Sequence, residues 1–252
     1  MILNPKISIV MQVYLGDYPG SRKNSTDKFI RAIDSFLNQS YSNSELVIVS
    51  DGCGITHNLY LEKYKLEPRI KYAYVSKNGM PNMYDLVGDQ KYYRGIPRQV
   101  GVTITTGDLI TYMDSDDILL PNYLDLVVKY ITLINLQNPD SNLDFYANTT
   151  WFDSADHRWP EGSATYSTEN AETYKFKQVS GEWVISQVKQ GMIVMAPWLF
   201  IHKKKSDIDW KDTTGTSEDV DFNVRFRKSY KNGAQINAPG YIRCHYSNLW
   251  DY

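Results

Sequence analysis

The amino-acid sequence predicts an α/β fold in which a mostly parallel central sheet is flanked by helices. Through the first 120 residues, short runs rich in β-branched and aliphatic residues alternate with amphipathic stretches, which is the pattern of βαβ units. Each run ends at a residue able to hydrogen-bond, and parallel sheets bind ligands at the carboxyl ends of their strands. The 252 residues, of which 42% are hydrophobic, suffice to bury one sizeable core.

The first half holds four predicted strands with helices between them. The strands are expected at residues 6–14, 45–50, 69–76 and 108–113, and the helices at residues 25–41, 56–66 and 96–106. Ser25 or Thr26 can cap the first helix, and Pro97 suits the first turn of the third. Residues 78–95 are irregular and polar, so we expect a loop with a helical turn there.

The second half is less regular. Helices are expected at residues 121–134 and 217–233, and strands at residues 144–147, 192–202 and 241–247. Ser217 is the expected cap of the last helix. Residues 153–177 are polar and contain Gly, Ser and Thr, so we expect a loop. No linker marks a separate domain, and we predict a single domain over residues 1–252, divided into a ligand-binding half at 1–120 and a second half at 121–252.

Composition excludes several classes of protein. The net charge of −2 gives no overall basic field for nucleic acid or an anionic membrane. No apolar run approaches the ~20 residues that span a bilayer, and the first residues lack the apolar core of a signal peptide. The two cysteines, Cys53 and Cys244, fit a reducing compartment, so we expect a cytoplasmic protein.

Three carboxylates crowd into four positions after the fourth strand, in "ITYMDSDDILLPNYL". In an extended segment Asp114 and Asp116 would point to one side and Asp117 to the other. Two carboxylates are a partial shell for Mg²⁺ or Mn²⁺, which complete their coordination with water and substrate phosphates. The alternative is a polar turn in which Asp117 or a neighbour caps the next helix. An EF-hand is excluded, because its loop glycine and its glutamate at the twelfth position are missing.

Four segments jointly resemble family 2 glycosyltransferases, which have the GT-A fold, a Rossmann-like architecture. "ISIVMQVY" resembles the first strand of that family and "ELVIVSDGC" the second. "GVTITTGDLITYMDSDD" resembles the segment that ends in its metal-binding DxD motif, and "TSEDVDFNVRF" resembles its Glu-Asp element. The four occur in the family's order within residues 6–226. The resemblance implies transfer of a sugar from a nucleoside-diphosphate sugar, with a less regular, acceptor-binding C-terminal half.

The resemblance also implies a metal and a set of donor contacts around the acidic stretch. Asp116, with Asp114 beside it, would hold Mn²⁺ or Mg²⁺ against the diphosphate of the donor. Asp114 would also hydrogen-bond the ribose, and Ser115 between them would contact the donor. The metal would neutralise the charge that develops on the departing diphosphate.

Further donor contacts are implied at other strand ends. Asp51 would accept the imide N–H of a uracil-type base, which Gln12, Val13 and Tyr14 would cradle, and Arg98 would contact the donor or neighbouring carboxylates. Each has a simpler explanation. Asp51 is a favoured turn residue, Tyr14 could be a core or rim aromatic, and Arg98 could be a solvated helix charge.

The Glu-Asp element implies the catalytic base. Asp219 would remove the proton from the acceptor hydroxyl, with Glu218 as the second candidate. Both also suit the first turn of a helix, where the dipole favours acidic side chains by roughly 0.3–1 kcal/mol. His245 would be a third metal ligand or a hydrogen-bonded strand histidine. Trp198 would stack on a sugar acceptor or pack in the core.

The expected reaction is an inverting, metal-dependent transfer of one hexosyl or pentosyl unit, with a UDP-sugar as the expected donor. The Gln-x-x-Arg-Trp signature of processive members is absent, and Gln12 replaces a proline common in the first strand motif. The acceptor stays open between a glycan, a lipid-linked sugar and a modified base of DNA, because the basic cluster at residues 202–205 would attract phosphate. The alternatives are a non-catalytic nucleotide-sugar-binding module and a phosphohydrolase with an aspartate nucleophile, whose motif belongs on the first strand.

Overall fold

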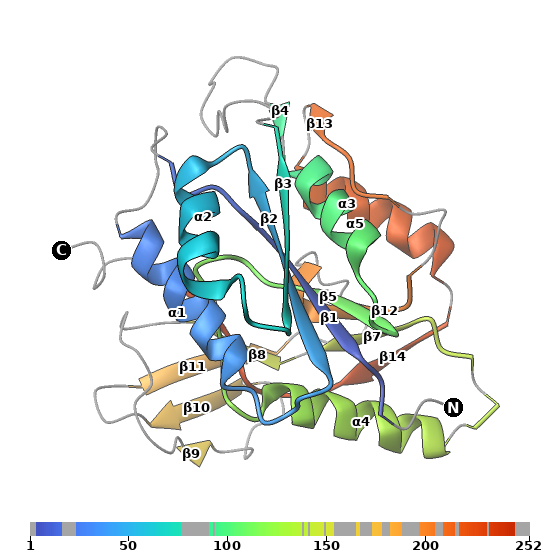
Figure 1. Ribbon diagram of the computed structural model, residues 1–252. Helices are drawn as coiled ribbons and strands as arrows, with labels where there is room; N and C mark the ends of the chain where they lie inside the picture. The colour runs from blue at the N-terminus through green and yellow to red at the C-terminus, as the bar shows by residue number, and fades with distance from the viewer. Residues whose placement is uncertain are drawn as a thin grey trace.

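The computed structural model confirms the α/β prediction (Figure 1). It describes residues 4–16, 24–76, 91–92, 94–137, 139–140, 142–148, 150–153, 165–166, 173–177, 182–187, 197–204, 209–214, 217–230 and 232–244. The central sheet has the strand order β14 (Gly233–Ile236), β7 (Phe145–Asn148), β12 (Phe200–His202), β5 (Leu109–Tyr112), β1 (Ile7–Val13), β2 (Ser44–Asp51) and β3 (Ile70–Val75). Strands β5, β1, β2 and β3 are parallel, as are β14 and β7, whereas β12 is antiparallel to both of its neighbours.

Helices cover both faces of this sheet. Figure 1 shows α1 (Ser25–Leu37) and α2 (Gly54–Leu59) on one side, and α3 (Gly95–Ile104) and α5 (Glu218–Ser229) on the other. The alternation along β1 explains the two layers, since Ile9 and Met11 belong to the core cluster under α1 and Val10 to the cluster under α5. Helix α4 (Tyr123–Gln137) packs into the first cluster, and a π-helical turn, Tyr60–Tyr64, extends α2.

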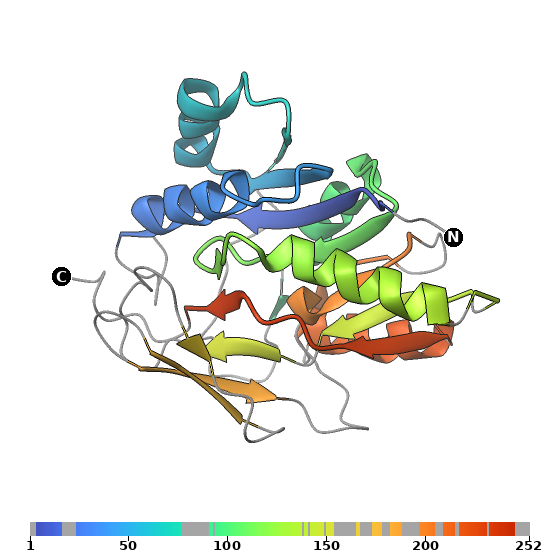
Figure 2. The ribbon, with the colours of Figure 1, turned by 90° about the horizontal axis from the view of Figure 1, so that it is seen from below.

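A second sheet occupies the region where we expected a loop. Its strands are, in order, β6 (Ile118–Leu119), β15 (Tyr241–Arg243), β8 (Thr150–Asp153), β11 (Glu182–Gln187), β10 (Thr173–Lys177) and β9 (Thr165–Tyr166). Figure 2 shows β10 and β11, in orange, at the opposite end of the view from α2. The loop prediction for residues 153–177 was therefore wrong at β9 and β10, because antiparallel pairing between consecutive strands, β9 with β10 and β10 with β11, satisfies the backbone of these polar segments.

Two smaller expectations were also wrong. Asn24, in the left-handed region with φ 55, is the N-cap of α1, so Ser25 and Thr26 already lie inside the helix. The strand expected at residues 192–202 is shorter, since a 3₁₀ helix at Pro197–Leu199 precedes β12. Pro197 has no N–H to give to a sheet ladder, which is the physical reason. Residues 192–196 lie outside the described residues.

Candidate functional site

The carboxyl ends of β1, β2 and β5 meet at one edge of the central sheet. Val13 of β1 is in register with Ser50 of β2, and Val10 is in register with Tyr112 of β5. Tyr14, Asp51 and the acidic stretch that begins at Asp114 are thereby placed along the same edge, as the strand pattern predicted. Asp51 is the last residue of β2, and Gly52 after it has φ 65, a conformation that favours glycine and turns the chain away from the sheet.

The three crowded aspartates have different surroundings. The backbone N–H of Asp117 donates to the carbonyl oxygen of Asp114 at 3.2 Å, which closes a tight turn. The Asp114 side chain is 41% exposed, and Asp116 is half-buried. Asp117 is buried, and its carboxylate accepts hydrogen bonds from the hydroxyl of Tyr241 at 2.6 Å and from the backbone N–H of Cys244 at 2.8 Å. Asp117 is thus part of the scaffold, and Asp114 and Asp116 are the accessible pair.

The carboxylates of Asp114, Asp116 and Asp117 repel one another in this turn. Burial raises the pKa of Asp117 well above its usual range, the charges of Asp116 and Asp114 raise it further, and the hydrogen bonds from Tyr241 and Cys244 oppose this only in part. A cation bound beside the turn would relieve that repulsion. We conclude that the oxygen ligands of Asp114 and Asp116 fit a partial shell for a hard divalent cation.

The described part of the chain adds no third side chain to this pair. No group of three or more His, Cys, Asp or Glu side chains suited to a metal ion occurs among the residues that the structure describes. His245, the expected third ligand, lies outside these residues, directly after Cys244 and its hydrogen bond to Asp117.

Arg98 joins three of the predicted segments. Its guanidinium, only 5% exposed, donates from Nε to the side-chain oxygen of Gln12 at 2.6 Å and from Nη1 to Glu218 at 2.8 Å. Its Nη2 lies 3.5 Å from Oδ1 of Asp114. The first-strand, DxD and Glu-Asp segments therefore converge on one buried cation, and the solvated-charge explanation of Arg98 does not hold.

The two candidate bases differ in their surroundings as well. Glu218 is 3% exposed and its carboxylate is tied to Arg98, so it is poorly placed to reach an acceptor. Asp219 is half-buried, and the hydrogen bonds of its carboxylate within the described residues, from the Ser217 hydroxyl and the N–H of Val220, both go to Oδ1. Asp219 can therefore present Oδ2 to a substrate, which favours it as the base.

Trp210 is a site residue that the sequence did not reveal. Its ring is 2% exposed, and the guanidinium carbon of Arg98 lies 4.7 Å from the ring centroid. Its only sequence signal was an aromatic residue in the polar stretch "IDWKD", which does not distinguish a site residue from any other.

Trp198 lies in the core rather than at a surface. It is 6% exposed, and its ring stacks on Tyr241 with centroids 4.5 Å apart. Tyr241 in turn binds Asp117. Little of the indole is open to an acceptor, so this arrangement supports the core-packing explanation.

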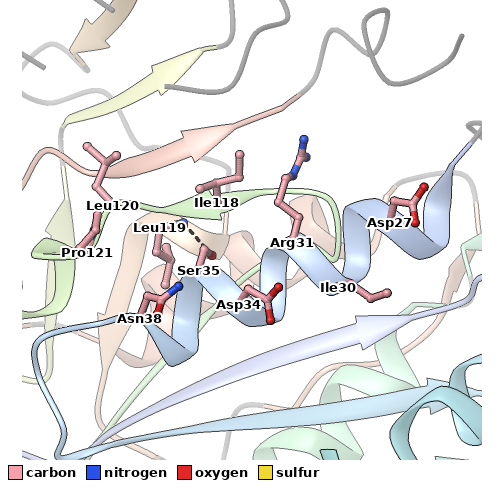
Figure 3. A pocket seen from close by; sticks show the side chains of 10 residues that line it. All are labelled: Asp27, Ile30, Arg31, Asp34, Ser35, Asn38, Ile118, Leu119, Leu120 and Pro121. Carbon is pink, nitrogen blue, oxygen red and sulfur yellow. Dashed lines mark hydrogen bonds between the residues drawn. The ribbon is translucent and has the colours of Figure 1, made fainter. Parts of the chain in front are cut away.

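A groove flanks the acidic turn on its α1 side. It has a volume of about 490 Å³ and lies between α1 and β6, as Figure 3 shows. Arg31 lines it and donates from Nη2 to the backbone carbonyl of Asp116 at 2.7 Å, so the groove abuts the turn. None of the predicted site residues that the structure describes lines it. Its lining residues are Asp27, Ile30, Arg31, Asp34, Ser35, Asn38, Ile118, Leu119, Leu120 and Pro121.

Relatives of this chain are named glycosyltransferases. A protein of Rickettsia bellii with the name "uncharacterized glycosyltransferase" is 26% identical over 131 residues, which make up 52% of this chain and 16% of that protein. A Methanocaldococcus jannaschii protein, uncharacterized glycosyltransferase MJ1057, is 24% identical over 222 residues, or 88% of this chain and 64% of its own length. The chain thus spans less than two thirds of these relatives. No protein-family model matches it.

A protein of known structure has the same fold. TarS 1–349 of S. aureus, in complex with UDP-GlcNAc, superposes with a TM-score of 0.60 at 16% identity, and the match covers 95% of this chain and 58% of that one. The mostly parallel sheet with its flanking helices is therefore the fold of TarS, which binds UDP-GlcNAc in that structure. Within the described residues, no helix has the length and apolarity required to cross a bilayer.

Proposed function

We propose that this chain is a metal-dependent, inverting glycosyltransferase domain of GT-A fold that moves one sugar from a nucleoside-diphosphate sugar to an acceptor hydroxyl. The observation that carries the proposal is the convergence of Gln12, Asp114 and Glu218 on Arg98. These residues belong to three separate segments that resemble family 2 glycosyltransferases, and the fold brings them to one edge of the sheet. The names of the relatives support the same class.

The donor would lie along the carboxyl ends of β1, β2 and β5. Asp51 would accept the N–H of a uracil-type base, which makes a UDP-sugar the proposed donor. Val13 and Tyr14 would flank the base. Ser115 and Asp114 would contact the ribose and the diphosphate, with Arg98 fixing the position of the Asp114 carboxylate.

Asp114 and Asp116 would hold Mn²⁺ or Mg²⁺, and His245 remains a proposed third ligand. When bound, the ion supplies positive charge beside the leaving diphosphate.

Asp219 would act as the general base. As its carboxylate takes the proton of the acceptor hydroxyl, the acceptor oxygen forms a bond to the anomeric carbon of the sugar. The bond from that carbon to the diphosphate oxygen breaks on the opposite face, and UDP leaves with the bonding electrons. One base and one in-line displacement invert the anomeric configuration.

For the acceptor we propose only a chemical class, a molecule with a free hydroxyl. A glycan, a lipid-linked sugar and a modified DNA base each offer a hydroxyl, and Trp198 is too buried to discriminate between them. We propose a single, non-processive transfer, because the segment after Asp219 lacks the Gln-x-x-Arg-Trp signature. Cys53 is a buried free thiol, which is consistent with the proposed cytoplasmic location.

The test is UDP release from a panel of UDP-sugars, with Mn²⁺, with EDTA, and with a panel of hydroxyl-bearing acceptors. We expect release that depends on the metal and rises with one class of acceptor. UDP binding without turnover on the whole panel would instead identify a non-catalytic nucleotide-sugar-binding module. Phosphate release from simple phosphomonoesters would identify a phosphohydrolase.

A further inference from the structure

We propose that Trp210 is a positioning residue of the transfer reaction and that it acts through Arg98. The proposal rests on the proposed function, because it concerns the same site. It adds a residue that none of the four motif segments contains. Trp210 belongs to a segment at residues 209–214. We call this segment the strap because its side chains bind both α3 and α5.

Contacts on several sides fix the indole ring of Trp210. Phe222 of α5 stacks on one face, with centroids 3.9 Å apart and an interplanar angle of 5°, so the guanidinium of Arg98 lies over the other face. The indole N–H donates to the hydroxyl of Tyr112 at 2.9 Å, and the backbone N–H donates to the side chain of Gln99 at 2.8 Å. The ring therefore has one orientation, and Arg98 packs against a rigid wall.

The indole ring of Trp210 restricts the orientation of the Arg98 guanidinium. Its Nε and Nη1 are engaged by Gln12 and Glu218 within the guanidinium plane, and the indole covers one face of that plane. A buried guanidinium over an aromatic ring is stabilised electrostatically and cannot take up water on that side. Its remaining nitrogen, Nη2, lies 3.5 Å from Oδ1 of Asp114, whose side chain is 41% exposed.

The strap also ties Trp210 to the helix that carries the proposed base. Arg225 of α5 donates to the carboxylate of Asp209 at 3.1 Å. At the other end, the carboxylate of Asp212 accepts the backbone N–H groups of Gly95 and Ile96, each at 3.1 Å, and so caps α3. Helix α3 carries Arg98 and α5 carries Asp219. The strap thus holds the donor side and the base side of the site in one arrangement.

Kinetics distinguish this positioning role from ordinary core packing. Trp210→Phe keeps an aromatic face for Arg98, and Trp210→Leu removes it. Phe226→Leu is the matched control. Phe226 lies in the same aromatic cluster, but its ring packs on Phe200 and Tyr230 and not on Arg98. All variants are compared at a temperature at which circular dichroism shows them folded.

We expect Trp210→Leu to lower kcat for sugar transfer roughly 10- to 100-fold, at a nearly unchanged KM for the acceptor. Trp210→Phe should retain at least a third of kcat, and Phe226→Leu should do the same despite an equal loss of thermal stability. In an Arg98→Gln background, Trp210→Leu should cost no more than a further twofold, since its route of action is already gone. A full additional loss in that background, or an equal loss in Phe226→Leu, would overturn the proposal.

A readout without turnover separates this proposal from the proposed function. The side-chain Nε–H of Arg98, assigned with Arg98→Lys, should give a sharp, slowly exchanging NMR signal in the wild type, in Trp210→Phe and in Phe226→Leu. Trp210→Leu should lose it. An unchanged signal in Trp210→Leu refutes positioning by Trp210 whether or not UDP is released, whereas absence of any UDP release from the wild type refutes only the proposed function.

Discussion

Side chains of one type take different roles in this site according to their burial and partners. Asp114 is 41% exposed and faces Arg98, while Asp117 is buried on Tyr241 and Cys244. A buried acceptor with two donors aimed at it is costly to remove, because both donors are then left unpaired. An exposed carboxylate costs little to remove unless a ligand needs it. The same substitution at these two positions should therefore affect different properties.

We expect Asp117→Ala to lower the free energy of unfolding by about 2–3 kcal/mol, because the Tyr241 hydroxyl and the Cys244 N–H then lose their acceptor. Asp114→Ala should cost less than about 1 kcal/mol but weaken UDP binding in the presence of Mn²⁺ roughly tenfold or more. Urea unfolding and calorimetric titration with UDP measure the two quantities. If Asp114→Ala were as destabilising as Asp117→Ala, the division between an accessible and a structural carboxylate would be wrong.

The Glu218–Asp219 pair gives a second contrast between neighbours. Asp219→Asn should leave the affinity for UDP within about threefold and lower transfer by roughly 10²–10⁴-fold, which is the usual contribution of a general base. Glu218→Gln weakens the buried pair with Arg98, so its main effect should be on stability and on UDP affinity. Transfer rates with saturating acceptor decide this, and transfer that persists in Asp219→Asn would exclude Asp219 as the base.

Among the elements, those built from local signals were predictable and those built from distant pairing were not. Strands β1, β2, β3 and β5 follow from apolar runs, and α3 follows from Pro97 near a helix start. β10 carries a strand signal in the alternation of "TYKFK", but the polar composition of residues 153–177 hides it, and its partner β11 is unremarkable as sequence. These strands belong to a sheet because β11 pairs with β8 and β8 pairs with β15, and both of those pairings join segments that are distant in sequence.

The site shows the same division. Asp51, Asp114 and the Glu-Asp pair were recognisable because they lie in motif segments, and Arg98 was recognisable because it lies just before the DxD segment. Trp210 was not, since its partners Gln99 and Tyr112 are 111 and 98 positions away in the chain. Contacts of such range depend on how α3, β5 and α5 pack, and a single sequence carries no local trace of them.

The cap of α3 can be tested by mutation. It joins the strap to a helix more than 100 residues earlier in the chain. Gly95 begins the helix directly against the strap, where an added Cβ would lie 2.1 Å from the carbonyl of Lys211. Asp212→Ala removes the acceptor for two N–H groups and should lower the free energy of unfolding by about 1 kcal/mol. Asp212→Asn keeps an acceptor oxygen and should lose less than half of that. If urea unfolding showed the same loss of free energy of unfolding in Asp212→Ala and Asp212→Asn, the acceptor oxygen of Asp212 would not be what stabilises the start of α3.

Across the whole molecule, the two edges of the central sheet are used differently. The candidate site lies at the carboxyl ends of the strands, whereas Glu45 lies near the amino end of β2. Its buried carboxylate accepts from Ser8 at 2.7 Å and pairs with Lys6 at 2.6 Å and with Lys71 at 3.1 Å. Burial alone would raise the pKa of Glu45, but the hydrogen bonds from Lys6, Thr106 and Ser8 outweigh it and lower the pKa to about 2. This edge therefore joins β1, β2 and β3 through one charged centre.

A second buried titratable group lies between the sheet and α5. The carbonyl of Lys203 can only accept, so Nδ1 of His202, 2.8 Å away, carries the ring proton, and Nε2 accepts from the hydroxyl of Tyr112 at 3.0 Å. Burial lowers the pKa of His202 to about 4, although the hydrogen bond to Lys203 opposes it. The histidine is therefore neutral in the folded state at pH 7.

These two groups predict a stability that falls in two steps as the pH is lowered. The folded pKa of His202 is below its unfolded value of 6.5, so between pH 6.5 and about 4 only the unfolded state takes up this proton, and stability falls. Glu45 also has a lowered folded pKa, and its contribution is lost as the pH falls from 4.5 towards 2. Each group contributes a slope of at most about 1.4 kcal/mol per pH unit.

Urea unfolding at half-unit steps from pH 7 to pH 3 tests this assignment. His202→Phe should remove the slope between pH 6.5 and about 4 and leave the decline below pH 4.5. Glu45→Gln should lower stability at pH 7 and flatten the curve only below pH 4.5, because the amide does not titrate. A His202→Phe curve parallel to the wild type down to pH 4.5 would mean that the pKa of His202 is the same in the folded and unfolded states, so that its burial does not lower that pKa.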